Sequence, residues 1–452
     1  MTRTVISRRK LIESLCGWTG SIGLANLLSN TDAKAAPLGH YTGPQLPPKA
    51  KHVIVLFMQG GPSQIDMFDP KPTLVKYQGQ RPSEVNLRTE RSTGGLFPSP
   101  FEYRKYGRSG IEISSLLPHL ATVADDLCVV KSMYTFNPTH TPGVNLFHCG
   151  TILATRPSMG AWVSYGLGAE NENIPSFIVL GGGGAAAAQS GFLPSEFQGA
   201  TFNGAANRPD DVIPNLRNHW LTADEKRRTL DEVQTLNREF SESVGSDPFL
   251  DGRIQSLESA FRMQSEAYDL VDLSQEPEDI RTEYGDSTFG KCCLMARRLV
   301  EKGVRFVHIN FANWDDHIEI DKKLAQRCPD MDQAAAALIR DLKRRGKLDE
   351  TLVVWGGEFG RTPVSESGTG RDHNPYGFTV FLAGGGVEGG LSYGATDEFG
   401  FKAVENRVSV HDLHATILNR LGIDHTRLTY RYAGRDFRLT DVFGDVVNDI
   451  LI

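Results

Sequence analysis

Residues 351–381 read TLVVWGGEFGRTPVSESGTGRDHNPYGFTVF and contain two short apolar runs separated by a polar segment. The first run, residues 351–355, predicts a buried strand because it is apolar and is followed by Gly356 and Gly357. The second run, residues 378–382, predicts a strand that returns to the core. Both strands fit the interior of an α/β protein.

The polar residues between these two runs predict a site for a metal and an anion. Glu358 and Arg361 follow the first run, and a glycine-rich segment, expected to be a loop, then carries Arg371, Asp372 and His373. Binding residues of open α/β sheets gather beyond the carboxyl ends of the strands. The alternative is a charged surface loop. Histidines and carboxylates that follow other predicted strands favour a site.

Composition excludes some classes of protein. The 452 residues are enough for one large domain or two, and the hydrophobic and charged fractions are ordinary for a globular protein. The net charge of −7, without a dominant basic patch, makes nucleic acid an unexpected partner. The six cysteines form no CxxC pair, so neither a cysteine metal site nor a disulfide framework is indicated.

Residues 1–36 predict an export signal. Arg8 and Arg9 lie in the segment SRRKLI, a weakly apolar stretch continues to Leu28, and the residues at 33–35 provide a small-residue cleavage site. The stretch is too polar for a stable membrane span. We therefore expect export through the twin-arginine pathway to the periplasm or the medium, without a transmembrane segment in the mature chain. The alternative is an amphipathic N-terminal helix.

A strand predicted at residues 52–58 ends in the turn QGGPS and is followed by two carboxylates, Asp66 and Asp69. Either carboxylate could bind a metal at that edge of the sheet. The alternative for each is capping of a turn or a helix.

A second strand predicted at 127–131 leads into a loop that carries Thr139, His140 and Thr141. We expect the next helix to begin only near residue 144. A hydroxyl or an imidazole on this loop could act as a nucleophile or as a metal ligand.

The middle of the chain predicts a strand at 176–180, a loop at 190–216 and helices at 222–243 and 253–271, and four glycines stand at 181–184. The glycines do not match a dinucleotide-binding GxGxxG pattern. The helices carry mixed charges at i,i+4 spacing, so residues 185–275 are interpreted as a helical insert that could cover the site.

A strand predicted at 304–311 is followed by Asp315 and His317. An aspartate and a histidine two residues apart can hold a metal from a single turn. The next helix is predicted at 331–345, with Asp330 as its cap. Later, His411 and His414 lie one helical turn apart, and they favour a helix packed beneath the site over a ligand pair.

Together these strand ends predict a site for one or two divalent ions. A mixed set of histidines and carboxylates suits zinc, manganese or iron, of which zinc and manganese are favoured, and calcium is a less favoured alternative because of the imidazoles. Arg361 and Arg371 would bind a phosphate or sulfate. The predicted metal ligands are Asp66, Asp315, His317, Glu358 and His373.

Six motifs resemble the alkaline-phosphatase-like superfamily and, more closely, a family of secreted bacterial proteins of unknown function, DUF1501. They are SRRKLI, FMQGGPSQIDMFDPKP, NWDDH, TLVVWGGEFGRTP, GRDHNPYG and VHDLHATIL. The resemblance implies a three-layer αβα sandwich with a mostly parallel central sheet over residues 37–452.

The resemblance also implies roles for individual residues. Asp315 and His317 match the clamp of one metal position, and His373 matches the histidine that completes it. Glu358 matches the second position, where Phe359 replaces the usual adjacent histidine or asparagine.

Two departures concern catalysis. The residues at 59–61 replace the aspartate pair of sulfatases, and Asp66 could substitute for it. His140 occupies the nucleophile position and Val144 the arginine position. Either Thr139 or Thr141 would then be the nucleophile, or His140 would be a ligand and a water would attack.

We therefore expect an exported metal-dependent hydrolase of a small-molecule or glycan phosphate or sulfate ester. The residues predicted to act in catalysis are Thr141, His140, Arg361 and Arg371. The alternative is a non-catalytic exported binding or cell-envelope protein on the same scaffold.

Overall fold

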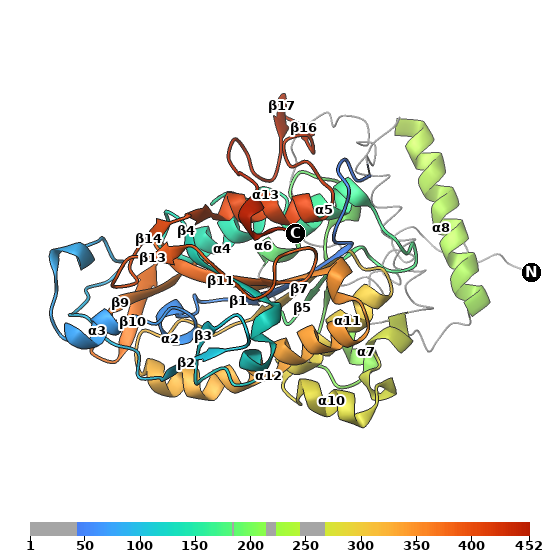
Figure 1. The fold of residues 1–452 in the computed structure, drawn as a ribbon. Coiled ribbons are helices and arrows are strands. Elements are labelled where there is room, and N and C mark those ends of the chain that lie inside the picture. Colours follow the sequence, from blue (N-terminus) through green and yellow to red (C-terminus); the bar gives the residue numbers. More distant parts are fainter. Residues whose placement is uncertain (1–42, 183–184, 214–222, 245–266) are drawn as a thin grey trace, which may run out of the picture.

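The computed structural model describes residues 43–182, 185–213, 223–244 and 267–452, with helices on both faces of one large sheet (Figure 1). The predicted export signal and most of the predicted helix at 253–271 lie outside the described residues. None of the helices described combines the length and the apolar character needed to cross a bilayer.

Nine strands of the described residues form the main sheet, and β11 is the one that runs against its neighbours. It pairs antiparallel with β8 and β4, whereas every other pair in this sheet is parallel. The predicted mostly parallel sheet is therefore confirmed. The order is β12 (Leu391–Tyr393), β4 (Leu127–Tyr134), β11 (Phe378–Ala383), β8 (Thr351–Gly356), β1 (His52–Met58), β7 (Phe306–Phe311), β5 (Phe177–Leu180) and β6 (Ala200–Phe202), with β15 (Val408–Ser409) beside β4.

Alternation along the buried strands divides the core between the two faces of the sheet. Ile54 and Leu56 of β1 belong to one hydrophobic cluster, and Val53 and Val55 belong to the other, because successive side chains point to opposite faces. Helices α11 (Thr288–Glu301) and α12 (Ile320–Arg344) pack on the first face, and α4 (His140–Cys149), α5 (Met159–Leu167) and α13 (Val410–Arg420) on the second (Figure 1).

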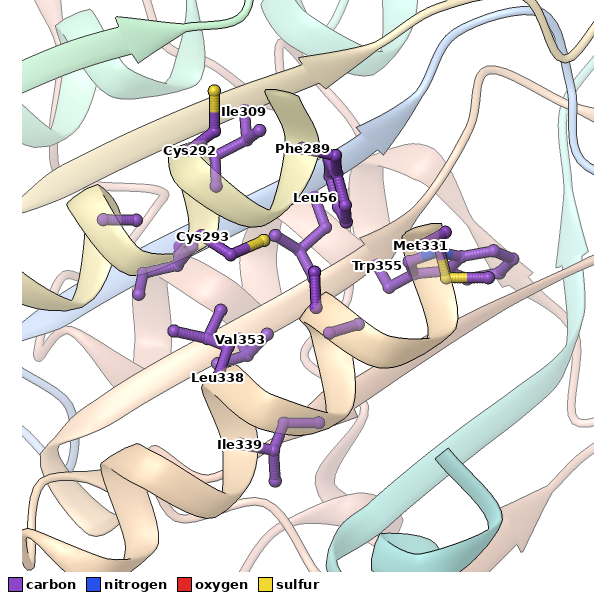
Figure 2. Packing of buried hydrophobic residues seen from close by; sticks show 14 of the residues in the cluster. Leu56, Phe289, Cys292, Cys293, Ile309, Met331, Leu338, Ile339, Val353 and Trp355 are labelled. Carbon is purple, nitrogen blue, oxygen red and sulfur yellow. The ribbon is translucent and has the colours of Figure 1, made fainter. Parts of the chain in front are cut away.

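Packing on the first face joins α11 and α12 to the central strands. Figure 2 shows Cys293 of α11 and Leu338 of α12 directed toward Val353 of β8 and Leu56 of β1. All the cysteines of the described residues are buried and unpaired.

Smaller elements lie around the sheet. They are α2 (Gln64–Met67), α3 (Pro72–Lys76), β2 (Tyr103–Tyr106), β3 (Ile111–Ser114), α6 (Ala185–Ala188), α7 (Pro209–Val212), α8 (Ala223–Val244), α10 (Glu278–Tyr284), the hairpin β9 (Gly360–Glu366) and β10 (Gly370–Asn374), and the pairs β13 (Ala395–Thr396) with β14 (Ala403–Glu405) and β16 (Tyr430–Tyr432) with β17 (Arg435–Phe437).

Four element predictions need correction, and the last of them, the loop expected before His373, is described with the site below. Helix α12 begins at Ile320, with Pro329 inside it, so Asp330 is not a cap. Burial of Leu324 and Cys328 extends the apolar stripe and offsets the roughly 3 kcal/mol cost of an interior proline. The segment predicted as a loop at 190–216 contains β6, an edge strand of the main sheet.

The third correction concerns the residues after β4. Helix α4 begins at His140 and not near residue 144, so His140 and Thr141 lie in its first turn. Pro142 does not disturb the helix because the first turn leaves its backbone N–H groups without intrahelical partners. His140 is therefore placed by a helix that packs on the sheet.

Candidate metal centre

Four parallel strands end at one edge of the sheet and bring their following residues together. Gly60 follows β1, His140 follows β4, Asp315 follows β7 and Glu358 follows β8. The segment predicted as a polar loop is instead the β9–β10 hairpin, whose second strand places His373 at the same edge. The order of the strands in the sheet thus brings together residues that are far apart in the sequence.

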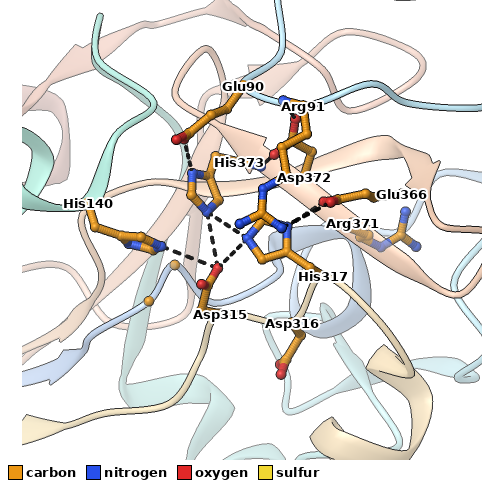
Figure 3. A network of polar contacts seen from close by, with 12 residues as sticks. Glu90, Arg91, His140, Asp315, Asp316, His317, Glu366, Arg371, Asp372 and His373 are labelled. Carbon is orange, nitrogen blue, oxygen red and sulfur yellow. Dashed lines mark hydrogen bonds and ion pairs between the residues drawn. The ribbon is translucent and has the colours of Figure 1, made fainter.

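Asp315 lies at the centre of three imidazoles (Figure 3). Its Oδ1 is 2.7 Å from Nε2 of His317, 3.0 Å from Nε2 of His373 and 3.2 Å from Nε2 of His140. The Nε2 atoms of His317 and His373 are 3.1 Å apart, and all four donors lie within 4.8 Å of one another. We call these four potential metal-ligand atoms, Oδ1 of Asp315 and the three Nε2 atoms, the four-donor group.

The four-donor group is buried on one side and open on the other. His373 and His317 are buried, whereas the side chains of His140 and Asp315 are 33% and 40% exposed. A ligand would therefore approach from the side of His140 and Asp315.

The charges in this group compensate one another only in part. Burial favours a neutral Asp315, yet the close approach of the three histidines and of Arg361 holds the pKa of its carboxyl well below the usual range. Burial favours a neutral His140, yet Asp315 and Glu358 raise its pKa to about 9. Nε2 of His140 is nevertheless left without a hydrogen bond. Converging imidazole nitrogens and a carboxylate fit a divalent cation.

Glu358, predicted as a metal ligand, lies outside the four-donor group. Its buried carboxylate accepts the N–H of Gly60 at 2.9 and 3.1 Å and lies 2.8 Å from Nδ1 of His140. The backbone turn after β1 holds this carboxylate behind the His140 ring. Glu358 therefore lies behind the His140 ring and contacts that ring at Nδ1, the nitrogen that points away from Asp315.

Arg361, predicted to bind an anion, is buried and satisfied by the protein. Its guanidinium donates to the carbonyl oxygens of Gly60, Gly61, Trp314 and Arg371, and lies 2.6 Å from Oδ1 of Asp315. Because these contacts use its donors, Arg361 joins the turn after β1, the loop after β7 and the hairpin, and is not available to a substrate.

Arg371 and Asp66 form a buried ion pair away from the four-donor group. Nε and Nη2 of Arg371 lie 2.8 and 3.1 Å from the two carboxylate oxygens of Asp66, and Nη1 donates to the carbonyls of Phe97 and Thr362. Each of these two residues neutralises the charge of the other, and neither belongs to the four-donor group. Asp69 is likewise engaged, by Thr396 and Lys71.

Of the three candidates after β4, His140 enters the four-donor group, whereas Thr139 and Thr141 are exposed. The pair His411 and His414 lies elsewhere. Their Nε2 atoms donate to the backbone carbonyls of Gly150 and Phe147, so α13 packs against α4.

A comparison with family models matches residues 50–451 to a family described as "Protein of unknown function (DUF1501)". The chain belongs to the DUF1501 family. No curated protein matches this DUF1501 sequence.

Among solved structures, the DUF1501 chain is similar to sulfatase-like and phosphatase-like enzymes. The PsFucS1 sulfatase from Pseudoalteromonas sp. has 13% identity and a TM-score of 0.36, over 87% of this chain and 75% of that one. The lipoteichoic acid synthase LtaP from Listeria monocytogenes has 10% identity and a TM-score of 0.39, over 87% and 76%. The alkaline phosphatase from the Antarctic bacterium TAB5 has 12% identity and a TM-score of 0.31, over 75% and 92%.

The DUF1501 centre also contains two glutamates that were not among the sequence predictions. Glu366 contacts Nδ1 of His317, and Glu90 lies 2.6 Å from Nδ1 of His373. Glu366 lies in the hairpin that carries His373 and could have been suspected from that position. No local pattern marks Glu90.

A second group of potential ligands, His317, Glu366 and Asp372, lies behind the first. Asp372 already accepts the backbone N–H groups of Arg91 at 2.6 Å and His373 at 2.8 Å. Its carboxylate is therefore used to fix the backbone of the DUF1501 centre.

Proposed function

We propose that this DUF1501 protein is an exported metal-dependent hydrolase that acts on a phosphate or sulfate ester. The proposal rests on one observation, the convergence of three imidazole Nε2 atoms on the carboxylate of Asp315. Imidazole suits zinc, whereas calcium prefers oxygen ligands. Three nitrogen donors and one oxygen donor therefore favour zinc over manganese and calcium.

The residues of the four-donor group would hold the metal ion, and two of them would also leave a side open for the substrate. Asp315, His140, His317 and His373 would hold one ion, which would supply Lewis-acid polarisation of the ester oxygens. The buried His317 and His373 exclude water behind the site. The exposed side at His140 and Asp315 gives a small-molecule or glycan ester room to approach.

The first experiment is elemental analysis of the purified protein beside an Asp315→Ala/His317→Ala variant. We expect about one transition-metal ion per chain in the parent protein and a loss of that ion in the variant. Asp321→Ala is the control, because Asp321 is an exposed residue of the first turn of α12. Absence of metal after incubation with zinc and manganese would refute the proposal.

Turnover is then measured with 4-nitrophenyl phosphate and 4-nitrophenyl sulfate. His140→Ala should weaken zinc binding at least 10-fold, because the imidazole is one of four donors. Thr141→Ala should leave zinc binding unchanged, because Thr141 is exposed and not a donor. Loss of turnover in Thr141→Ala with zinc retained would assign Thr141 as the nucleophile, and unchanged turnover would exclude it.

A second candidate function is that of an exported binding or cell-envelope protein. The burial of Arg361 and Arg371 supports it, because both guanidiniums predicted to bind the ester anion are engaged by the protein itself. Zinc bound at the four-donor group without turnover of any ester in a broad panel would favour this function.

Export is part of the proposal and rests on the segment SRRKLI. Replacement of Arg8 and Arg9 by lysine should retain the protein in the cytoplasmic fraction, because twin-arginine signals are read by a receptor. Unchanged export of this double variant would remove the twin-arginine assignment.

A further inference from the structure

The geometry points to three glutamates as positioning residues of the metal centre, each holding one imidazole through Nδ1. This inference rests on the proposed function, because it concerns the same four-donor group. The pairs are Glu358 with His140 at 2.8 Å, Glu366 with His317, and Glu90 with His373 at 2.6 Å.

A carboxylate at Nδ1 determines what Nε2 can do. When Nδ1–H donates to a carboxylate, the neutral ring carries its lone pair on Nε2 and becomes a stronger ligand. Figure 3 shows the rings of His140, His317 and His373 directed toward Asp315, with glutamates behind two of them. The same arrangement at all three rings is an organised second layer around one centre.

Glu358 and Glu366 are the enclosed members of this layer. The side chain of Glu358 is fully buried and that of Glu366 is 8% exposed. Both come from the segment that starts at the end of β8 and continues through β9, so a single stretch of chain supports His140 at the start of α4 and His317 in the loop after β7.

Glu90 reaches the centre from outside the main sheet. The backbone around it is held on both sides, because the Tyr376 hydroxyl donates to the carbonyl of Arg88 at 3.0 Å and the Gly94 N–H donates to the carbonyl of Ser365 at 2.7 Å. This segment, held at both ends, places the carboxylate of Glu90 against His373, the most buried histidine of the centre. The side chain of Glu90 is itself 33% exposed.

Glu90 is not the sole hydrogen-bond acceptor for Nδ1 of His373, so the effect of its charge can be tested by itself. Nδ1 of His373 also lies 2.6 Å from the backbone carbonyl of Pro138, which alone can fix the tautomer. Glu90 therefore adds negative charge behind the ring. Glu90→Gln removes this charge and keeps an acceptor of the same shape.

The test is the zinc affinity of the purified protein, measured by competition with a chromophoric chelator at constant pH and salt. We expect Glu90→Gln, Glu358→Gln and Glu366→Gln each to bind zinc about 10–100-fold more weakly than the parent. The control is Glu84→Gln, since Glu84 is an exposed glutamate of the same part of the chain, and its carboxylate accepts a hydrogen bond from the hydroxyl of Ser83. It should bind zinc as the parent does.

Two further measurements separate positioning from general destabilisation. The thermal unfolding midpoint of metal-free Glu90→Gln should equal that of the metal-free parent, while the absorption spectrum of the cobalt-substituted protein should change. Glu90→Asp keeps the charge and should recover part of the affinity. Equal zinc affinity in the parent and Glu90→Gln would overturn the inference, whereas a parent that binds no zinc would refute the proposed function itself.

Discussion

At the level of single residues, two buried arginines illustrate how the protein uses its charges. Arg361 and Arg371 have no exposed surface and donate to backbone carbonyls as well as to carboxylates. A guanidinium can satisfy several acceptors at once because its donors are fixed in one plane. Both residues therefore hold the backbone that carries the four-donor group.

We predict that Arg371→Met lowers the free energy of unfolding by about 3–5 kcal/mol, because it leaves the buried Asp66 without its partner. Chemical denaturation measures this loss. Arg431→Met is the control, since the exposed ion pair of Arg431 with Asp436 contributes no more than about 1 kcal/mol. A stable Arg371→Met variant that loses only ester turnover would restore the predicted anion-binding role.

At the level of elements, the turn after β1 must approach the loop after β7 closely. Gly60 has a φ of +120°, and a Cβ added to it would lie 2.6 Å from the backbone nitrogen of Asp315. Only glycine combines this conformation with this approach. The N–H of the same residue also donates to the carboxylate of Glu358, so one turn positions both Asp315 and Glu358.

We predict that Gly60→Ala weakens zinc binding more than 10-fold, because the loop that carries Asp315 must move to admit the methyl group. Chelator competition measures the change. Gly79→Ala is the control, since Gly79 also has a positive φ of +76° but has open space around its Cβ position. Equal losses in the two variants would show that backbone strain, and not displacement of Asp315, is responsible.

Buried histidines also connect elements on the second face of the sheet. His148 of α4, His308 of β7 and His414 of α13 are buried, and the rings of His148 and His308 are 4.7 Å apart. Burial lowers the pKa of all three, to about 3 for His308 and His414. These histidines are therefore neutral parts of the core.

These pKa values predict a loss of stability in acid. Because the folded protein holds His414 at a pKa of about 3, the unfolded chain takes up the proton first as the pH falls below 6.5. The neutral histidines therefore cost the folded protein nothing well above pH 6.5. Below that pH the free energy of unfolding decreases, by about 2 kcal/mol per histidine between pH 7 and 5.

Denaturant unfolding at pH 7 and pH 5 tests this prediction with His414→Gln, which can still donate to the carbonyl of Phe147. The pH-dependent loss should be smaller by the contribution of one histidine. His119→Gln is the control, because His119 is exposed. An identical pH dependence in the parent and His414→Gln would contradict the prediction.

At the level of the whole molecule, the proposed ion would join segments that are far apart in the sequence. His140 follows β4, Asp315 and His317 follow β7, and His373 lies in the hairpin after β8. An ion that binds only the folded arrangement stabilises it in proportion to the logarithm of its concentration.

We predict that zinc at about 1,000 times its dissociation constant stabilises the protein by about 4 kcal/mol and that a chelator reverses this. Thermal unfolding with and without chelator measures the shift. The Asp315→Ala/His317→Ala variant should show no shift. A chelator effect of equal size in this variant would place the stabilising ion elsewhere.

Much of the fold follows from local sequence. Strands β1, β7 and β8 were predictable because each is a short apolar run bounded by polar residues or glycine, and α11 because its apolar positions repeat with helical spacing. The start of α12 was not predictable, since tertiary burial overrides the proline at position 329.

By itself, the sequence determined that Asp315 and His317 directly follow one buried strand and that His373 comes between two others, because apolar runs and the types of their neighbours are local features. Only the tertiary structure decided that His140 joins Asp315, His317 and His373. It also decided that Glu358 lies behind His140 and that the guanidinium of Arg361 donates to backbone carbonyls. These outcomes depend on pairing across 218 residues between His140 and Glu358 and 283 between Glu90 and His373. Electrostatic pairing depends on distance in space, and spacing along the chain does not encode it.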